Sequence, residues 1–141
     1  MTTDILSPQS EADWAEAVVT AKTPLSIQGG GTQGMGIADA NCLSTAGLNG
    51  VTLYEPGALT LVAKAGTPVA DISDMLAKEN QRLAFDPRDL RGALATDGAT
   101  TLGAVAAMYH SGTPRATAGP RPPCHVGARV VTGWDARLTQ G

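Results

Sequence analysis

The chain has 141 residues, which is enough for one domain with a hydrophobic core and short for two. Hydrophobic residues make up 43% and charged residues 16%, a balance that excludes an intrinsically disordered protein. The net charge of −3 is unevenly spread, because residues 81–141 hold seven arginines and only four acids. A basic, glycine-rich half suits a small anionic ligand. With no lysine cluster and only 4% aromatic residues, nucleic acid is disfavoured as a partner.

A helix and a short strand are expected before the first glycine-rich loop. Ser7 or Ser10 can cap a helix that buries Trp14 on one face. Residues 25–27 then read as a short strand that leads into the loop. Residues 35–41 have no periodicity, and we expect them to form loop.

The middle of the chain predicts a β-hairpin. Residues 51–54 and 59–65 read as two strands, and the Pro-Gly pair within residues 55–58 marks the turn between them. The second strand alternates, which places Leu59 and Leu61 on one face.

Two further helices and two further strands are expected after the hairpin. A helix opens at Pro68, with the apolar stripe Val69, Ile72, Met75 and Leu76. Residues 83–85 predict a brief strand, residues 100–109 a helix and residues 126–131 the last strand. The order mixes helical crossovers with a hairpin, which indicates an α+β fold.

The chain shows no sign of export or of a metal centre. No apolar run approaches the length of a membrane span and no signal sequence is apparent, so we expect a cytoplasmic protein. Cys42 and Cys124 are expected to be buried or idle thiols. Together with His110 and His125, they lack the spacing of metal ligands. An isolated histidine more often satisfies a local hydrogen bond, so no catalytic residue is assigned.

The most informative segment is the glycine-rich loop within residues 24–36. It reads Pro-Leu-Ser-Ile-Gln-Gly-Gly-Gly-Thr-Gln-Gly-Met-Gly and holds five of the 17 glycines. Glycine accepts positive φ angles, so bare backbone amides can converge on a phosphate there, and we expect a nucleotide or dinucleotide cofactor. Gly29, Gly31 and Gly34 also have Rossmann spacing. The aperiodic residues after Gly36 argue against the helix that a Rossmann loop requires.

A second glycine region, residues 98–104, places Thr100 and Thr101 before an expected helix. Free N–H groups and the dipole at a helix N-terminus attract an anion. Taken alone, the simpler interpretation is the ordinary N-cap of an alanine-rich helix. Two such loops in one small domain favour a different interpretation, in which both close over one diphosphate.

Five segments, taken in this order, resemble a known family. They are Pro-Leu-Ser-Ile-Gln-Gly-Gly-Gly-Thr (24–32), Tyr-Glu-Pro with Leu-Thr-Leu (54–56 and 59–61), Ala-Gly-Thr-Pro (65–68), Gln-Arg-Leu-Ala-Phe-Asp-Pro (81–87) and Thr-Thr-Leu-Gly (100–103). The chain resembles the FAD-binding domain of the p-cresol methylhydroxylase (PCMH) and vanillyl-alcohol oxidase type. Within that type it is similar to one of the FAD-binding subunits of bacterial glycolate oxidases.

The resemblance implies which residues hold FAD. The pyrophosphate would be wrapped by Gln28, Gly29, Gly30, Gly31, Thr32 and Gln33. The second wall, around the phosphates and the ribityl chain, would be Thr100, Thr101, Leu102, Gly103, Ser111 and Gly112. Pro87 would lie against the cofactor, and the backbone of Val126 would meet its adenine end. Thr32 stands where some relatives attach FAD to a histidine, so binding should be noncovalent.

The resemblance covers residues 1–141 as one domain, with the first βαβ subdomain and part of the second, mixed or antiparallel one. The chain departs from the family at Ala104, where a second glycine is usual. Residues 120–125, Pro-Arg-Pro-Pro-Cys-His, replace a turn that carries a carboxylate. The sequence ends at Gly141, before the family's flavin-closing segment and substrate cap, so we expect a truncated form that is not active alone.

Two functions follow from the resemblance. The first is the FAD-binding part of an oxidoreductase that transfers a hydride from a small 2-hydroxy acid such as glycolate to FAD, together with the other subunits of a glycolate-oxidase-like complex. Any attachment to a membrane would then run through a partner subunit. The alternative is a non-catalytic module that binds FAD or helps such a complex to assemble. A third interpretation is an incomplete domain that binds nothing.

Overall fold

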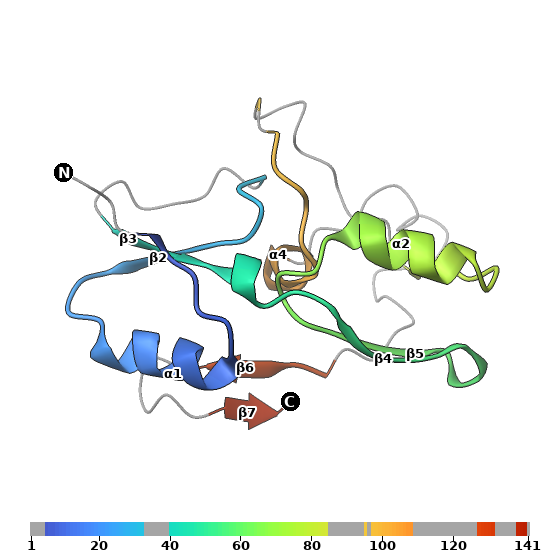
Figure 1. The fold of residues 1–141 in the computed structure, drawn as a ribbon, viewed down its shortest axis with the longest axis horizontal. Coiled ribbons are helices and arrows are strands. Elements are labelled where there is room, and N and C mark those ends of the chain that lie inside the picture. Colours follow the sequence, from blue (N-terminus) through green and yellow to red (C-terminus); the bar gives the residue numbers. More distant parts are fainter. Residues whose placement is uncertain are drawn as a thin grey trace.

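The computed structural model describes residues 5–32, 40–84, 95, 97–108, 127–131 and 138–140. The elements in chain order are β1 (Ile5–Leu6), α1 (Glu11–Thr20), β2 (Leu25–Gln28), β3 (Asn41–Ser44), the 3-10 helix η1 (Thr45–Gly47), β4 (Val51–Glu55), the 3-10 helix η2 (Pro56–Ala58), β5 (Thr60–Ala63), α2 (Val69–Ala77), α4 (Leu102–Met108), β6 (Arg129–Val131) and β7 (Leu138–Gln140). Figure 1 shows the first sheet and α1 on the left, β4, β5 and α2 on the right, and α4 between them. The α+β prediction is confirmed.

The first sheet is parallel and has the order β1-β3-β2, with α1 connecting its two outer strands. In the register, Ile5 and Ser26 both pair with Cys42. Leu43 of the central strand is fully buried. Because β2 and β3 are parallel, their carboxyl ends lie at one edge of the sheet, and the glycine-rich loop starts from that edge. Neither β1 nor β3 was expected from the sequence.

The helix α1 begins where the sequence predicts. The Ser10 side chain accepts a hydrogen bond from the Asp13 backbone N–H at 3.1 Å, which satisfies one of the free donors of the first turn. Ser10 rather than Ser7 is therefore the cap. Trp14 is buried against the rest of the domain, as expected.

The predicted hairpin forms from β4 and β5, with Tyr54 opposite Leu61 and a register shift between Val51 and Leu53. The turn is shifted by one residue towards the C-terminus from the expected one, because β4 extends to Glu55. It includes η2 and then Leu59, whose φ of 52° is left-handed and whose side chain is 81% exposed. The prediction that Leu59 shares a face with Leu61 is therefore wrong, because Leu59 belongs to the turn and β5 begins one residue later.

The helices α2 and α4 begin side by side. Pro68 and Thr101 form an isolated antiparallel bridge, and the Val69 N–H donates to the Thr100 carbonyl at 2.9 Å. Most of the predicted stripe of α2 is confirmed: Val69, Ile72 and Leu76 are buried, while Met75 is half-buried. Val105 of α4 is also buried, so both helices contribute to the core.

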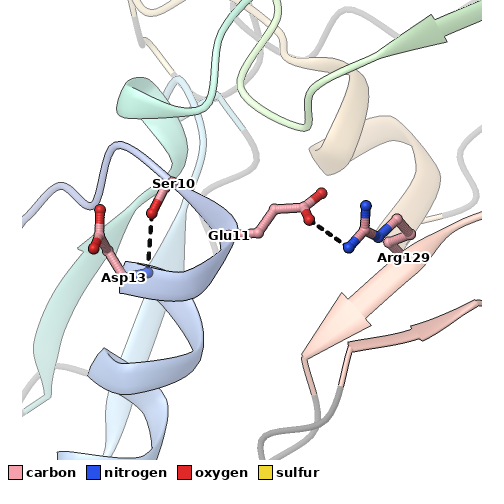
Figure 2. Close-up of polar contacts among 4 residues, drawn as sticks. All are labelled: Ser10, Glu11, Asp13 and Arg129. Atoms are coloured by element: carbon pink, nitrogen blue, oxygen red, sulfur yellow. Dashed lines mark hydrogen bonds and ion pairs between the residues drawn. The ribbon is translucent and has the colours of Figure 1, made fainter.

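Towards the C-terminus, β6 and β7 pair in antiparallel fashion, with Val130 opposite Thr139. The strand β6 lies beside α1, where the Arg129 guanidinium is 2.8 Å from the Glu11 carboxylate (Figure 2). The last predicted strand is thus confirmed for its second half.

Residues 83 and 84 belong to no strand, contrary to expectation, because the chain is irregular after α2.

Candidate functional site

The first glycine-rich loop leaves β2 at Gln28 and passes close to another stretch of backbone. Gly31 has a φ of +73°, which is the left-handed conformation that glycine adopts without strain. A Cβ atom on Gly30 would overlap the Ala99 carbonyl oxygen and lie 2.6 Å from its carbon. A Cβ atom on Gly29 would overlap the Thr101 hydroxyl. Gly29 and Gly30 are therefore required by the close approach of residues 98–101.

The contact is mutual, since a Cβ atom on Gly98 would overlap the Gly30 carbonyl oxygen. Beside it the Thr100 hydroxyl donates a long hydrogen bond of 3.5 Å to the Thr32 hydroxyl. Thr32 is only 2% exposed. Two regions separated by 68 residues in the sequence thus form one joined pair of loops. We call residues 28–32 together with residues 98–101 the loop pair.

The loop pair holds polar groups that have no hydrogen-bond partner among the residues that the structure describes. In the part of the chain that the structure describes, no carbonyl accepts a hydrogen bond from the backbone N–H groups of Gly29, Gly30, Gly31 or Thr32. The Thr101 hydroxyl is buried, and among the same residues it has no hydrogen-bond partner. A buried hydroxyl without a partner costs about 1–3 kcal/mol. This arrangement is typical of a site completed by an anionic ligand.

The start of α4 differs from the sequence prediction in one respect. The Leu102 N–H donates to the Thr67 carbonyl at 2.9 Å, and the Gly103 N–H donates to the Ala65 carbonyl at 2.8 Å. These two amides are therefore not the free donors that were expected for an anion. Gly103 is needed for packing, because a Cβ atom there would lie 2.8 Å from the Ala65 Cβ. On this side of the loop pair the available groups are the hydroxyls of Thr100 and Thr101.

The structure therefore brings together seven predicted residues that are present in the loop pair: Gln28, Gly29, Gly30, Gly31, Thr32, Thr100 and Thr101. Five others lie outside the described residues: Gln33, Pro87, Ser111, Gly112 and Val126. Gly98 and Ala99 were not predicted at the site, although the second glycine region contains both. Cys42 was not predicted there either, and its thiol donates to the Gln28 side-chain oxygen at 3.0 Å.

A comparison with protein families decides the identity of the domain. Residues 4–140 match the family model described as the FAD binding domain. The chain belongs to this family. The domain is of the PCMH type, its cofactor is FAD, and the mixed sheets agree with part of that fold. Such a domain is the cofactor-binding part of a flavin-dependent oxidoreductase. No curated protein matches the chain.

The residues present fit this cofactor. FAD carries a diphosphate, whose oxygens are acceptors, and the loop pair offers bare N–H groups and a buried hydroxyl that have no partner within the described residues and can donate to them. The glycines keep the two backbones close, where side chains would force them apart.

None of the helices in the described residues is both long and apolar enough to cross a bilayer.

Proposed function

We propose that this chain is the FAD-binding part of an oxidoreductase that acts on a small 2-hydroxy acid of the glycolate type. The observation that supports it most is the contact between the two glycine regions, where the Thr101 hydroxyl is buried and has no partner among the residues described. A single diphosphate between them would satisfy donors from both. The whole chain is proposed to serve as one domain for this purpose.

In this proposal the residues of the protein bind FAD and orient it. The amides of Gly29 to Thr32 donate to the diphosphate, and the hydroxyls of Thr100 and Thr101 add donors from the opposite loop. Thr32 offers no side-chain nitrogen for a covalent link, so FAD is held noncovalently. When bound, FAD supplies the acceptor for a hydride from the substrate α-carbon. We assign no catalytic residue in this domain, and propose that partner subunits of the complex provide the contacts to the substrate.

The absorption spectrum of the flavin tests the function directly. The full chain is incubated with FAD, passed through a desalting column, combined with its partner subunits and mixed with glycolate without oxygen, with 3-hydroxypropionate as the matched control. Retained yellow colour that bleaches only with glycolate supports the proposal. A yellow protein inert to 2-hydroxy acids, alone and with added partner subunits, would favour a non-catalytic FAD-binding or assembly module. A colourless protein would contradict FAD binding by this chain.

The mode of attachment is tested on the same sample. Acid precipitation unfolds the protein, and a noncovalent cofactor then remains entirely in the supernatant. Yellow colour that stays with the washed precipitate would contradict noncovalent binding.

A further inference from the structure

We propose that the Cys42 thiol is a positioning group for the cofactor. It fixes the orientation of the Gln28 side-chain amide, so that the NH₂ end of that amide faces the glycine loop and adds a donor to the diphosphate site. This inference rests on the proposed placement of the FAD diphosphate at the loop pair. It concerns a thiol that was expected to be buried or idle.

The strand register places the two side chains together. Ser26 pairs with Cys42 in the parallel ladder and Gln28 pairs with Ser44. Side chains two residues apart in a strand point to the same face, so Cys42 and Gln28 are diagonal neighbours on one face of the sheet. The Cys42 residue is 8% exposed, and its Sγ donates to Gln28 Oε1 at 3.0 Å.

The other end of the Gln28 amide points at the loop. Its Nε2 atom lies 2.9 Å from the position that a Cβ atom on Gly31 would occupy. Gly31 is the loop residue in the left-handed conformation, and its N–H is among the amides without a carbonyl partner in the described residues. The nitrogen of Gln28 is therefore beside the same amides that are proposed to face the diphosphate.

The thiol matters because the two ends of a carboxamide have nearly the same shape. One end accepts hydrogen bonds and the other donates them, and only the neighbours decide which end faces which way. The Cys42 thiol donates to the oxygen, which leaves both N–H bonds on the side of the loop. Without that donor the amide can turn its oxygen towards the loop, where it would repel an anion.

FAD titrations of cysteine variants test the positioning role. Cys42→Ala should weaken FAD binding about three- to tenfold, the effect of one lost hydrogen bond. Cys42→Ser keeps a donor and should bind FAD within about twofold of wild type. In the Gln28→Ala background, Cys42→Ala should cause no further loss. The inference would be overturned if Cys42→Ser and Cys42→Ala weakened FAD binding equally. It would also be overturned if Cys42→Ala caused the same loss of FAD affinity in the Gln28→Ala background as in wild type.

A measurement without FAD separates this inference from the proposed function. Alkylation of Cys42 by iodoacetamide is followed by mass spectrometry of its peptide, and Gln28→Ala should accelerate it because the amide no longer engages the thiol. Gln9→Ala, which removes an exposed amide that donates to the Ser7 carbonyl, is the control. An unchanged rate in Gln28→Ala overturns the thiol–amide bond even if wild type binds FAD. Acceleration in a protein that binds no FAD overturns the proposed function, and with it the role of the bond in cofactor binding.

Discussion

Thr67 and Thr101 are both buried threonines on facing segments, but their hydroxyl groups are in opposite situations. The Thr67 hydroxyl donates to the Lys64 carbonyl at 2.7 Å and accepts from the Gly50 N–H at 3.0 Å. The Thr101 hydroxyl has no partner among the described residues. Thr67 therefore stabilises the fold through its hydroxyl, whereas the Thr101 hydroxyl forms no hydrogen bond within the described part of the chain.

Replacing these threonines by valine, which has the same shape, should have opposite effects. We expect Thr101→Val to raise the free energy of unfolding of the cofactor-free protein by about 1 kcal/mol, because an unpaired buried hydroxyl is removed. The same change should weaken FAD binding about tenfold. Thr67→Val should lower the free energy of unfolding by about 1–3 kcal/mol. Urea denaturation and FAD titration of both variants measure these quantities.

A destabilised Thr101→Val protein with unchanged FAD affinity would contradict this assignment, since the hydroxyl would then serve the fold. The Thr67 variant serves as the control for the loss of a buried threonine hydroxyl as such.

The glycine at position 30 should not tolerate a side chain. We expect Gly30→Val to abolish FAD retention, because its Cβ would overlap the Ala99 carbonyl and the backbone of the loop would have to move. Gly57→Val is the matched control, since a Cβ there meets no atom within 4 Å. Retained flavin after desalting and the melting temperature without FAD are measured for both. Normal flavin retention by Gly30→Val would show that the diphosphate is held elsewhere.

At the level of elements, the hairpin and α2 are joined by a glutamine. The Tyr54 hydroxyl of β4 donates to Gln81 Oε1 at 3.0 Å, and Gln81 Nε2 donates to the Pro56 carbonyl at 2.8 Å. Desolvation raises the pKa of Tyr54 above its usual value of 10.0, and the Glu79 carboxylate raises this pKa further. The phenol is thus favoured in its protonated, donating form.

This raised pKa predicts a pH dependence at alkaline pH. A folded-state pKa above the unfolded one contributes stability that is fully present below the unfolded pKa and is lost as the pH rises through the folded pKa. We therefore expect the difference in unfolding free energy between wild type and Tyr54→Phe to be constant up to about pH 9 and to shrink above about pH 10. Urea denaturation across this range measures it. A constant difference up to pH 11 would contradict the coupling.

The elements that were predicted from the sequence carry a strong local signal. The periodic apolar stripe of α2 and the Pro-Gly turn of the hairpin specify these elements from neighbouring residues alone. The strand β3 has four residues with two adjacent buried side chains, Cys42 and Leu43, so it lacks the alternation by which strands are recognised. The strand β1 has only two residues, and its pairing with β3 is a tertiary contact.

The candidate site divides in the same way. The glycines that a close approach of two backbones requires can be recognised in the sequence. Residues 28–32 and the second glycine region were therefore predicted as parts of the candidate site. Which amides remain available depends on partners distant in the chain. The carbonyls of Thr67 and Ala65 accept hydrogen bonds from the first N–H groups of α4. The bridge between Pro68 and Thr101 beside them is a contact that no local sequence pattern indicates. The Cys42–Gln28 bond depends on the register of a strand that was not expected, so it was missed for the same reason.

At the level of the whole molecule, an ion pair links β6 to the first helix. The Glu11 and Arg129 side chains are 46% and 55% exposed and lie 2.8 Å apart. Figure 2 shows Glu11 in the first turn of α1, next to the Ser10–Asp13 cap. At least this arginine of the basic half is therefore engaged by a carboxylate of the protein. Exposed pairs of this kind contribute about 0.2–1 kcal/mol, so it adds little to the global stability.

Neutralising the pair should have a small, salt-dependent effect. We expect both Glu11→Gln and Asp13→Asn to lower the free energy of unfolding. The loss in Glu11→Gln should exceed the loss in Asp13→Asn by less than about 1 kcal/mol, and this excess should vanish at high salt. Asp13 is the control because it lies in the same first turn and is also favoured by the helix dipole. Denaturation at low and high ionic strength measures both variants. A larger loss that persists at high salt would contradict a solvent-screened pair.

The distance in sequence between the two halves of the loop pair has a consequence for biosynthesis. Thr32 and Thr100 are separated by 68 residues. Ribosomes deliver the N-terminal half first, so the glycines after β2 emerge well before the backbone that they must touch exists. Contacts between such distant residues also form slowly. If the diphosphate is held as proposed, a nascent chain can acquire its flavin only after residues 98–101 have been made.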